Sequence, residues 1–177
     1  MRTQSGVTLI EFLIGFVVLG VLVALAAPSF RDWMINSQIR TATDGIDNGL
    51  KLARSEAVRR NSPVRFRLMS STASGWAVEA LNRTSSSWDS FQIRDAGEGT
   101  ASVTVTATQS TVVFVGDGRV SPAPTSAITF DLSHSGGSSC ITTAGEGDMR
   151  CLRVTVSAGG SVRMCDPALS SGNVSSC

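Results

Sequence analysis

The 177-residue sequence has no tyrosine, one histidine and few lysines or aromatic residues. His134 and Lys51 are the single residues of their types, which narrows the chemistry available for general acid–base catalysis. Basic and acidic residues are also nearly balanced, since 15 of the first and 14 of the second give a net charge of +1. No strong field therefore attracts nucleic acid or an acidic substrate, and electrostatics alone identifies no partner.

The motifs of enzymes and metal sites are absent as well. His134 lies in the loop-like stretch 133–137, without a nucleophile elbow. The glycines at 116–118 lack the lysine and the following helix of a phosphate loop. No histidine or cysteine spacing suits a metal ion. We therefore expect no enzyme activity, no cofactor, no metal and no small-molecule substrate.

What the sequence does have is a long apolar run near its start. Residues 7–27 are nearly all Val, Leu, Ile, Phe, Ala and Gly, enough for a helix to cross about 30 Å of hydrocarbon. The alternative is a cleaved secretory signal, since residues 26–28 loosely imitate its cut site. Glu11, inside the apolar run, argues against a signal and is itself costly in a membrane.

After Pro28 the apolar residues recur every three or four positions, which predicts a helix with one apolar stripe that continues from the membrane segment. Polar residues between them, such as Asp47 and Lys51, are expected to face water or a neighbouring subunit. Pro28 and Gly45 are weak points, and residues 61–63 predict the end of the helix. The stripe consists of Phe30, Met34, Ile35, Ile39, Ala42, Ile46, Leu50, Ala53, Ala57 and Val58.

Beyond residue 63 the pattern changes to short β-like runs between stretches rich in Gly, Ser, Thr and Asp. Such runs are typical of antiparallel strands joined by turns, and the glycines at 159–160 predict a tight hairpin. The expected fold class is α+β, with a long N-terminal helix packed on a small β-rich head. The predicted strands are 64–69, 76–81, 102–106, 111–115, 127–132, 152–156 and 161–164.

All four cysteines lie in the last quarter of the chain. An even, clustered set without CxxC spacing favours disulfides over zinc, and disulfides place this part outside the cytoplasm. Four cysteines allow three pairings. Cys140 with Cys151 and Cys165 with Cys177 would close the shortest loops.

The start of the chain carries a specific motif. The hydrophilic leader 1–6 ends in Gly6, and Val7-Thr8-Leu9-Ile10-Glu11 follows before the unbroken apolar run. This arrangement resembles the processing site of type IV prepilins, with glutamate fifth after the cut and Val7 in place of the usual phenylalanine. The resemblance implies that a prepilin peptidase cuts after Gly6 and methylates the new amine of Val7.

The same resemblance gives Glu11 a role in assembly. In packed pilin helices, the family's glutamate meets the N-terminal amine of a neighbouring subunit and sets the axial stagger. Such an ion pair acts as a register device because a mismatched state leaves buried charges alone. The alternative is a carboxylate that reaches the nearby headgroups and has no function.

Two further strings are similar to the GspH/FimT family of type IV pilin-like proteins. They are LARSEAVRRNSPV at 52–64 and FVGDGRV at 114–120. With the leader, the resemblance covers nearly the whole chain. The family includes the minor pseudopilin H of type II secretion and the minor pilins FimU and FimT. Helix propensity and a stop signal account for the first string without any ligand.

A DNA-binding motif is partly present. Some FimT-type members bind DNA through a C-terminal Gly-Arg-x-Arg motif, and the corresponding string here is Gly160-Ser161-Val162-Arg163. Only Arg163 matches, and Arg153 and Arg150 are candidates to compensate for the missing phosphate contact. The alternative is a set of strand arginines that discourage aggregation.

Together these features are similar to those of a type IV pilin. The resemblance implies a leader at 1–6, a transmembrane and filament-core helix at 7–28, an amphipathic helix at 29–62 and a β-rich head at 63–177. We expect a minor type IV pilin in pilus assembly or initiation, whose partners are prepilin peptidase and other pilins. The expected location is the inner membrane, with the head in the periplasm, and then the filament. The alternatives are pseudopilin H and a DNA-uptake receptor on the pilus.

Overall fold

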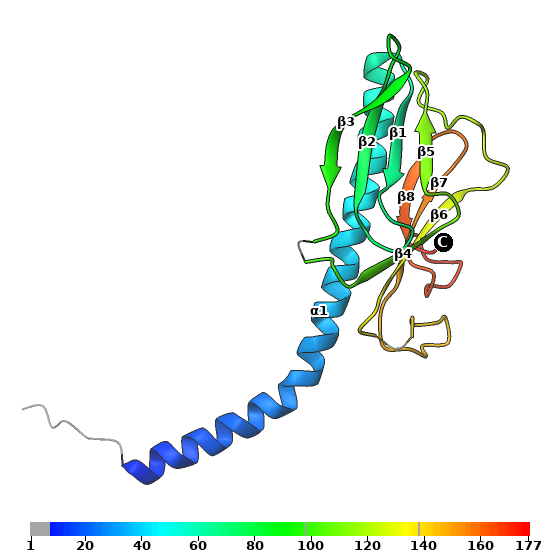
Figure 1. Cartoon of the computed structure of the whole chain (residues 1–177). Coiled ribbons are helices and arrows are strands. Elements are labelled where there is room, and N and C mark those ends of the chain that lie inside the picture. The colour runs from blue at the N-terminus through cyan, green and yellow to red at the C-terminus, as the bar shows by residue number, and fades with distance from the viewer. Residues whose placement is uncertain (1–7, 98, 138) are drawn as a thin grey trace, which may run out of the picture. The chain divides into compact units, whose positions relative to one another are not determined.

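The computed structural model describes residues 8–97, 99–137 and 139–177. In these residues the chain forms one α-helix and eight β-strands (Figure 1). It divides into two compact units, with the boundary between Met34 and Ile35. The second unit, which we call the head, contains the C-terminal part of the helix and all eight strands.

Helix α1 covers Leu9–Arg60 and continues through Pro28 and Gly45, so neither predicted weak point ends it. Its apolar stripe is buried only along the head. The buried members are Ile35, Ile39, Ala42, Ile46, Leu50, Ala53 and Ala57, whereas Phe30, Met34 and Val58 are exposed.

Asp47 corrects one expectation about this helix. Its side chain was expected to face water or a neighbouring subunit, but the residue is only 8% exposed. Asp47 follows the buried Ile46 and lies one helical turn before the buried Leu50, and the helix packs deeply enough to cover it. Oδ2 of Asp47 accepts a hydrogen bond of 2.6 Å from Nζ of Lys51, one turn further along.

The end of α1 is a Schellman cap. Asn61 has a φ of 45°, and its N–H donates to the carbonyl of Val58 at 3.2 Å. The N–H of Ser62 donates to the carbonyl of Ala57 at 3.2 Å. These two hydrogen bonds use carbonyls that the last helical turn leaves unpaired. The predicted helix end at 61–63 is therefore confirmed.

The strands form two four-stranded antiparallel sheets, with the orders β3-β2-β1-β5 and β4-β6-β7-β8. Their bounds are β1 Val64–Leu68, β2 Trp76–Asn82, β3 Ser87–Arg94, β4 Val103–Ala107, β5 Thr111–Phe114, β6 Ile128–His134, β7 Leu152–Val156 and β8 Val162–Cys165. Gly160, with a φ of 78°, forms the predicted hairpin between β7 and β8. Figure 1 shows the head part of α1 running alongside the first sheet.

One hydrophobic core joins α1 to both sheets. Buried and partly buried residues alternate along β1 and along the inner positions of β6, as one-sided strands require. The ring of Phe66 in β1 lies 5.7 Å from Trp76 in the same sheet and 5.8 Å from Phe130 in the other. The sequence supplies few aromatic residues, and three of them meet at this point.

The seven predicted runs coincide with seven of the strands, and β3 was not predicted. This strand forms an edge of its sheet and is mostly exposed. A bulge opposite Val78 and Glu79 also shifts its register. The two-residue alternation that indicates a strand is therefore missing from its sequence.

Candidate assembly surfaces

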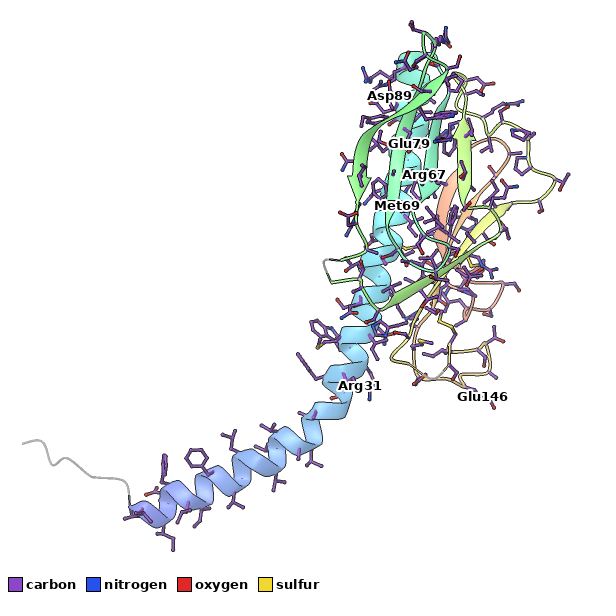
Figure 2. All side chains as sticks on the ribbon, in the orientation of Figure 1. Arg31, Arg67, Met69, Glu79, Asp89 and Glu146 are labelled. Carbon is purple, nitrogen blue, oxygen red and sulfur yellow. A yellow bond between two sulfur atoms is a disulfide. The ribbon has the colours of Figure 1, made fainter. Side chains whose placement is uncertain are left out.

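The N-terminal unit presents apolar side chains around its whole circumference. From Leu9 to Leu25 the large apolar residues are 52–79% exposed, and Figure 2 shows them projecting in all directions. This part of α1 is long and apolar enough to cross a membrane. A helix that is apolar on all sides requires lipid or other apolar helices around it.

Glu11 is the only charged residue among residues 8–27. It lies exposed in the first turn of α1, and its N–H donates to Oγ1 of Thr8 at 3.4 Å. Thr8 therefore acts as an N-cap, and the carboxylate of Glu11 is near the positive end of the helix. The predicted processing site, Gly6 and Val7, lies outside the described residues.

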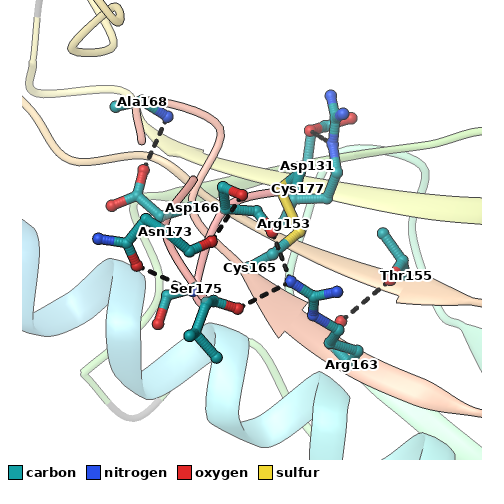
Figure 3. Close-up of a disulfide and its surroundings, with 12 residues drawn as sticks. Asp131, Arg153, Thr155, Arg163, Cys165, Asp166, Ala168, Asn173, Ser175 and Cys177 are labelled. Carbon is teal, nitrogen blue, oxygen red and sulfur yellow. Dashed lines mark hydrogen bonds and ion pairs between the residues drawn. A yellow bond between two sulfur atoms is a disulfide. The ribbon is translucent and has the colours of Figure 1, made fainter. Parts of the chain in front are cut away.

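The four cysteines form two disulfides, Cys140–Cys151 and Cys165–Cys177. Among the three pairings that the sequence left open, these close the shortest loops. The second disulfide holds the C-terminal tail, residues 166–177, against β8 (Figure 3). A bridge between Asp166 and Ser176, both in this tail, keeps its end folded back beside its first residue.

Arg163, the residue that matches the DNA-binding motif, contacts this tail. Its Nη2 donates to the carbonyl of Val174 at 3.0 Å and to that of Ser176 at 2.5 Å (Figure 3). Ser176 is buried, so its carbonyl would lose this partner without gaining water if the guanidinium turned outward. Arg163 therefore has a structural role in fixing the tail.

The two compensating arginines also have acceptors within the chain. Nε of Arg153 donates to Oδ1 of Asp131 at 2.6 Å, across the β6–β7 pair. Arg150 forms an ion pair with the buried carboxylate of Asp166. A DNA phosphate would compete with these carboxylates. DNA binding through the three arginines stays a prediction.

The two strings that resemble the GspH/FimT family lie against each other in the head. Nε of Arg54 in α1 donates to the carbonyl of Gly118 at 3.2 Å. A Cβ placed on Gly116 would be 2.3 Å from Oδ1 of Asn61, so a larger residue would have to displace the Asn61 side chain. The strings thus attach the end of α1 to the loop after β5, which sequence reasoning had not indicated.

His134 has a structural position at the end of β6. Its Nδ1 accepts a hydrogen bond of 2.8 Å from the N–H of Gly136. Nε2 therefore carries the hydrogen and donates to Oε1 of Gln38 in α1 at 2.9 Å. Within the part of the chain that the structure describes, no group of three His, Cys, Asp or Glu residues could hold a metal ion.

Sequence reasoning missed a charged cluster on the outer face of the first sheet. The side chain of Glu79 is only 4% exposed, and Arg65 and Arg67 of β1 both pair with it. Figure 2 shows Arg67 beside Glu79. Nη2 of Arg67 is 3.0 Å from Oε1 of Glu79, and Oγ of Ser90 donates to the same oxygen at 3.1 Å. The guanidinium of Arg65 also contacts the carboxylate and stacks on Trp88 at 4.4 Å.

Burial alone would raise the pKa of Glu79. The hydrogen bonds from Arg67, Arg65 and Ser90 lower it by more than burial raises it, so the pKa is below its ordinary value. The signal in the sequence is a glutamate within an apolar strand, next to a strand with two alternating arginines. The cluster ties β1 to β2 and β3, so its geometry indicates stabilisation of the sheet.

Comparison with known families identifies this architecture. Residues 42–160 match the family described as Type II transport protein GspH, which is more than half of the chain. The chain belongs to the GspH family. Residues 1–27 of this GspH-family protein match the Prokaryotic N-terminal methylation motif. No curated protein matches the sequence.

Solved structures with a similar fold include the type IV minor pilin FimU of Pseudomonas aeruginosa. It is 17% identical, with a TM-score of 0.56 over 72% of this chain and 88% of FimU. The minor pseudopilin EpsH of the Vibrio cholerae type 2 secretion system is 15% identical, with a TM-score of 0.54 over 75% of this chain and 99% of EpsH.

These similarities confirm the predicted type IV pilin-like fold. The GspH-family protein is a structural subunit of the pilin and pseudopilin class and not an enzyme.

Proposed function

We propose that this protein is a minor type IV pilin that takes part in pilus assembly or initiation. One observation carries the proposal. Residues 9–27 of α1 are apolar and exposed on all sides, match the methylation motif, and contain a single charge, Glu11. A membrane solvates such a helix before assembly, and the helices of other subunits replace the lipid in a filament.

The proposed sequence of events begins at the inner membrane. The head lies in the periplasm, where its two disulfides can form. Prepilin peptidase cuts between Gly6 and Val7, and the new amine becomes the charge partner for Glu11 of an adjacent subunit. Pairing relieves the cost of a carboxylate in hydrocarbon, a few kcal/mol, only when the two helices are in the correct axial register.

A pilus is proposed over a type II secretion machine because two disulfides stiffen this small head. Such a head suits a subunit that leaves the cell. Deletion of the gene tests the choice, with sheared surface pili and secreted enzymes measured in the same strain. Loss of pili with normal secretion is expected. Loss of secretion with normal pili would assign the protein to the secretion machine.

The proposed role of Glu11 gives a first prediction. Glu11→Ala is expected to insert into the membrane normally but to be absent from sheared filaments, because the register-setting ion pair is lost. Immunoblots of membrane and filament fractions measure both steps. Asp32→Ala is the matched control, since Asp32 is an exposed carboxylate on the same helix outside the apolar run. Normal amounts of Glu11→Ala in filaments would contradict the role.

A further inference from the structure

An exposed aromatic pair follows the apolar run of α1. Phe30 is 60% exposed and Trp33 is 63% exposed, and their ring centroids are 5.7 Å apart. The two other tryptophans, Trp76 and Trp88, belong to strands of the head, and Trp76 is 5% exposed. Trp33 is thus the one tryptophan of the sequence outside the head.

The neighbouring charges show where hydrocarbon must end. The apolar run continues to Ala27, and Arg31 and Asp32 are the first charged residues after Glu11. Charged side chains are costly in the bilayer centre, so the boundary between hydrocarbon and headgroups falls between Ala27 and Arg31. The aromatic pair alternates with these charges within one helical turn. It therefore lies at the boundary itself.

The helix rise places Trp33 at the depth of the headgroup layer. Its Cα is about 9 Å beyond that of Ala27 along the helix axis. Side chains of an α-helix tilt toward its N-terminus, which brings the indole back toward the hydrocarbon. The headgroup layer is about 5–7 Å thick on each side of a bilayer. The ring of Trp33 thus falls within it.

We propose that Phe30 and Trp33 anchor the unassembled protein in the lipid headgroup layer on the side of the head. This inference rests on the membrane-anchored subunit proposed above. Lipid is the occupant because Phe30 follows Ala27, the last residue of the apolar run, by less than one helical turn. Tryptophan also suits this layer, since its ring is apolar and its N–H can bond to water or a headgroup.

The anchor also sets the depth of the opposite end of the helix. From Leu9 to Trp33 the helix rises about 36 Å, close to the hydrocarbon thickness plus one headgroup layer. With Trp33 held in one headgroup layer, Leu9 is at the other boundary of the hydrocarbon. The Gly6–Val7 bond precedes Leu9 by two residues. The pair therefore holds the processing site at the membrane face opposite the head.

Fluorescence quenching in vesicles tests the anchor. The full chain is placed in vesicles of phosphatidylethanolamine and phosphatidylglycerol that contain lipids brominated either near the headgroup or deep in the acyl chain. The emission lost on Trp33→Phe substitution reports Trp33 alone. This difference signal is expected to be quenched more by the shallow bromines than by the deep ones. Trp88→Phe is the matched control, whose difference signal should respond to neither.

A difference signal that soluble iodide quenches and brominated lipids do not would overturn the anchor. Alkaline carbonate extraction of the wild-type protein separates this failure from that of the proposed function. Release of the wild-type chain would mean that the membrane-anchored subunit itself is wrong. A chain that stays in the membrane with Trp33 in water would overturn only the present inference. Filament loss in Trp33→Phe without lipid quenching would assign the pair to a neighbouring subunit instead.

The depth-setting role has its own readout. Phe30→Ser/Trp33→Ser is expected to remain in the membrane but to be cleaved severalfold more slowly by prepilin peptidase, because its processing site is no longer held at the membrane face. Val58→Ser is the control, since Val58 is an exposed apolar residue of the head part of α1. Equal cleavage rates for all three proteins would overturn the role of the pair in processing.

Discussion

At the scale of single residues, Glu79 shows how a buried charge becomes stabilising. A carboxylate that is 4% exposed is costly unless its oxygens accept hydrogen bonds. Arg65, Arg67 and Ser90 supply these bonds, and the two guanidiniums remain partly exposed. Because the guanidiniums keep part of their contact with water, the ion pairs of Glu79 cost less desolvation free energy than fully buried ion pairs would.

Removal of this charge is the residue-scale prediction. Glu79→Gln is expected to lower the free energy of unfolding by about 2–3 kcal/mol, because two arginines then face each other without an anion. Urea unfolding followed by tryptophan fluorescence measures the change. Glu56→Gln is the control, since Glu56 pairs with Arg59 and Arg60 on the helix surface and should cost less. Equal losses in the two variants would contradict the cluster's importance.

The same carboxylate predicts a dependence on pH. The folded protein lowers the pKa of Glu79 below its ordinary value of 4.5, so the unfolded chain binds the proton more readily. The stabilisation is fully present above pH 4.5 and is lost as the pH falls through the lowered pKa. Unfolding at pH 7 and at pH 3 should therefore show a smaller difference for Glu79→Gln than for the wild type. A difference of equal size would exclude this contribution.

At the scale of elements, the end of α1 depends on a residue that tolerates a positive φ. Asn61 has a φ of 45°, a conformation that costs other L-residues about 1–2 kcal/mol. Asn61→Ala is expected to lose about 1 kcal/mol of stability, whereas Asn61→Gly should keep the cap. Urea unfolding of both variants separates backbone strain from loss of the side chain. A similar loss in both would assign the effect to the contact of Asn61 with Gly116.

At the scale of the molecule, local signals predicted the elements and missed contacts between them. The stop at Asn61 and seven strands follow from local patterns, which act over a few residues. The burial of Asp47 depends on how deeply α1 packs, and the bulge in β3 depends on its pairing with β2. The residue pattern of a single segment predicts neither the burial of Asp47 nor the bulge in β3. The partners of Arg163 likewise appear only once the tail has folded back.

This folded tail gives the prediction for the whole head. Cys165→Ser/Cys177→Ser is expected to lower the free energy of unfolding by about 3 kcal/mol, since the disulfide closes a loop of sequence separation 12. The variant should also release the end of the tail, because Arg163 then holds it at Val174 and Ser176, while the ion pair of Arg150 fixes only its first residue, Asp166. Urea unfolding measures the first effect, and limited proteolysis with mass spectrometry measures the second.

The other disulfide provides the control for this prediction. Cys140→Ser/Cys151→Ser opens a loop of nearly equal length, with a sequence separation of 11, so the entropic part of the loss is the same. It should leave the tail protected from proteases, since Arg163 and Cys177 keep their partners. Tail cleavage at equal rates in both variants would mean that general loosening of the head, and not the Cys165–Cys177 attachment, controls access to β8. Early tail cleavage in the first variant alone would show that this disulfide covers the edge of the second sheet, where an open strand would otherwise pair with another chain.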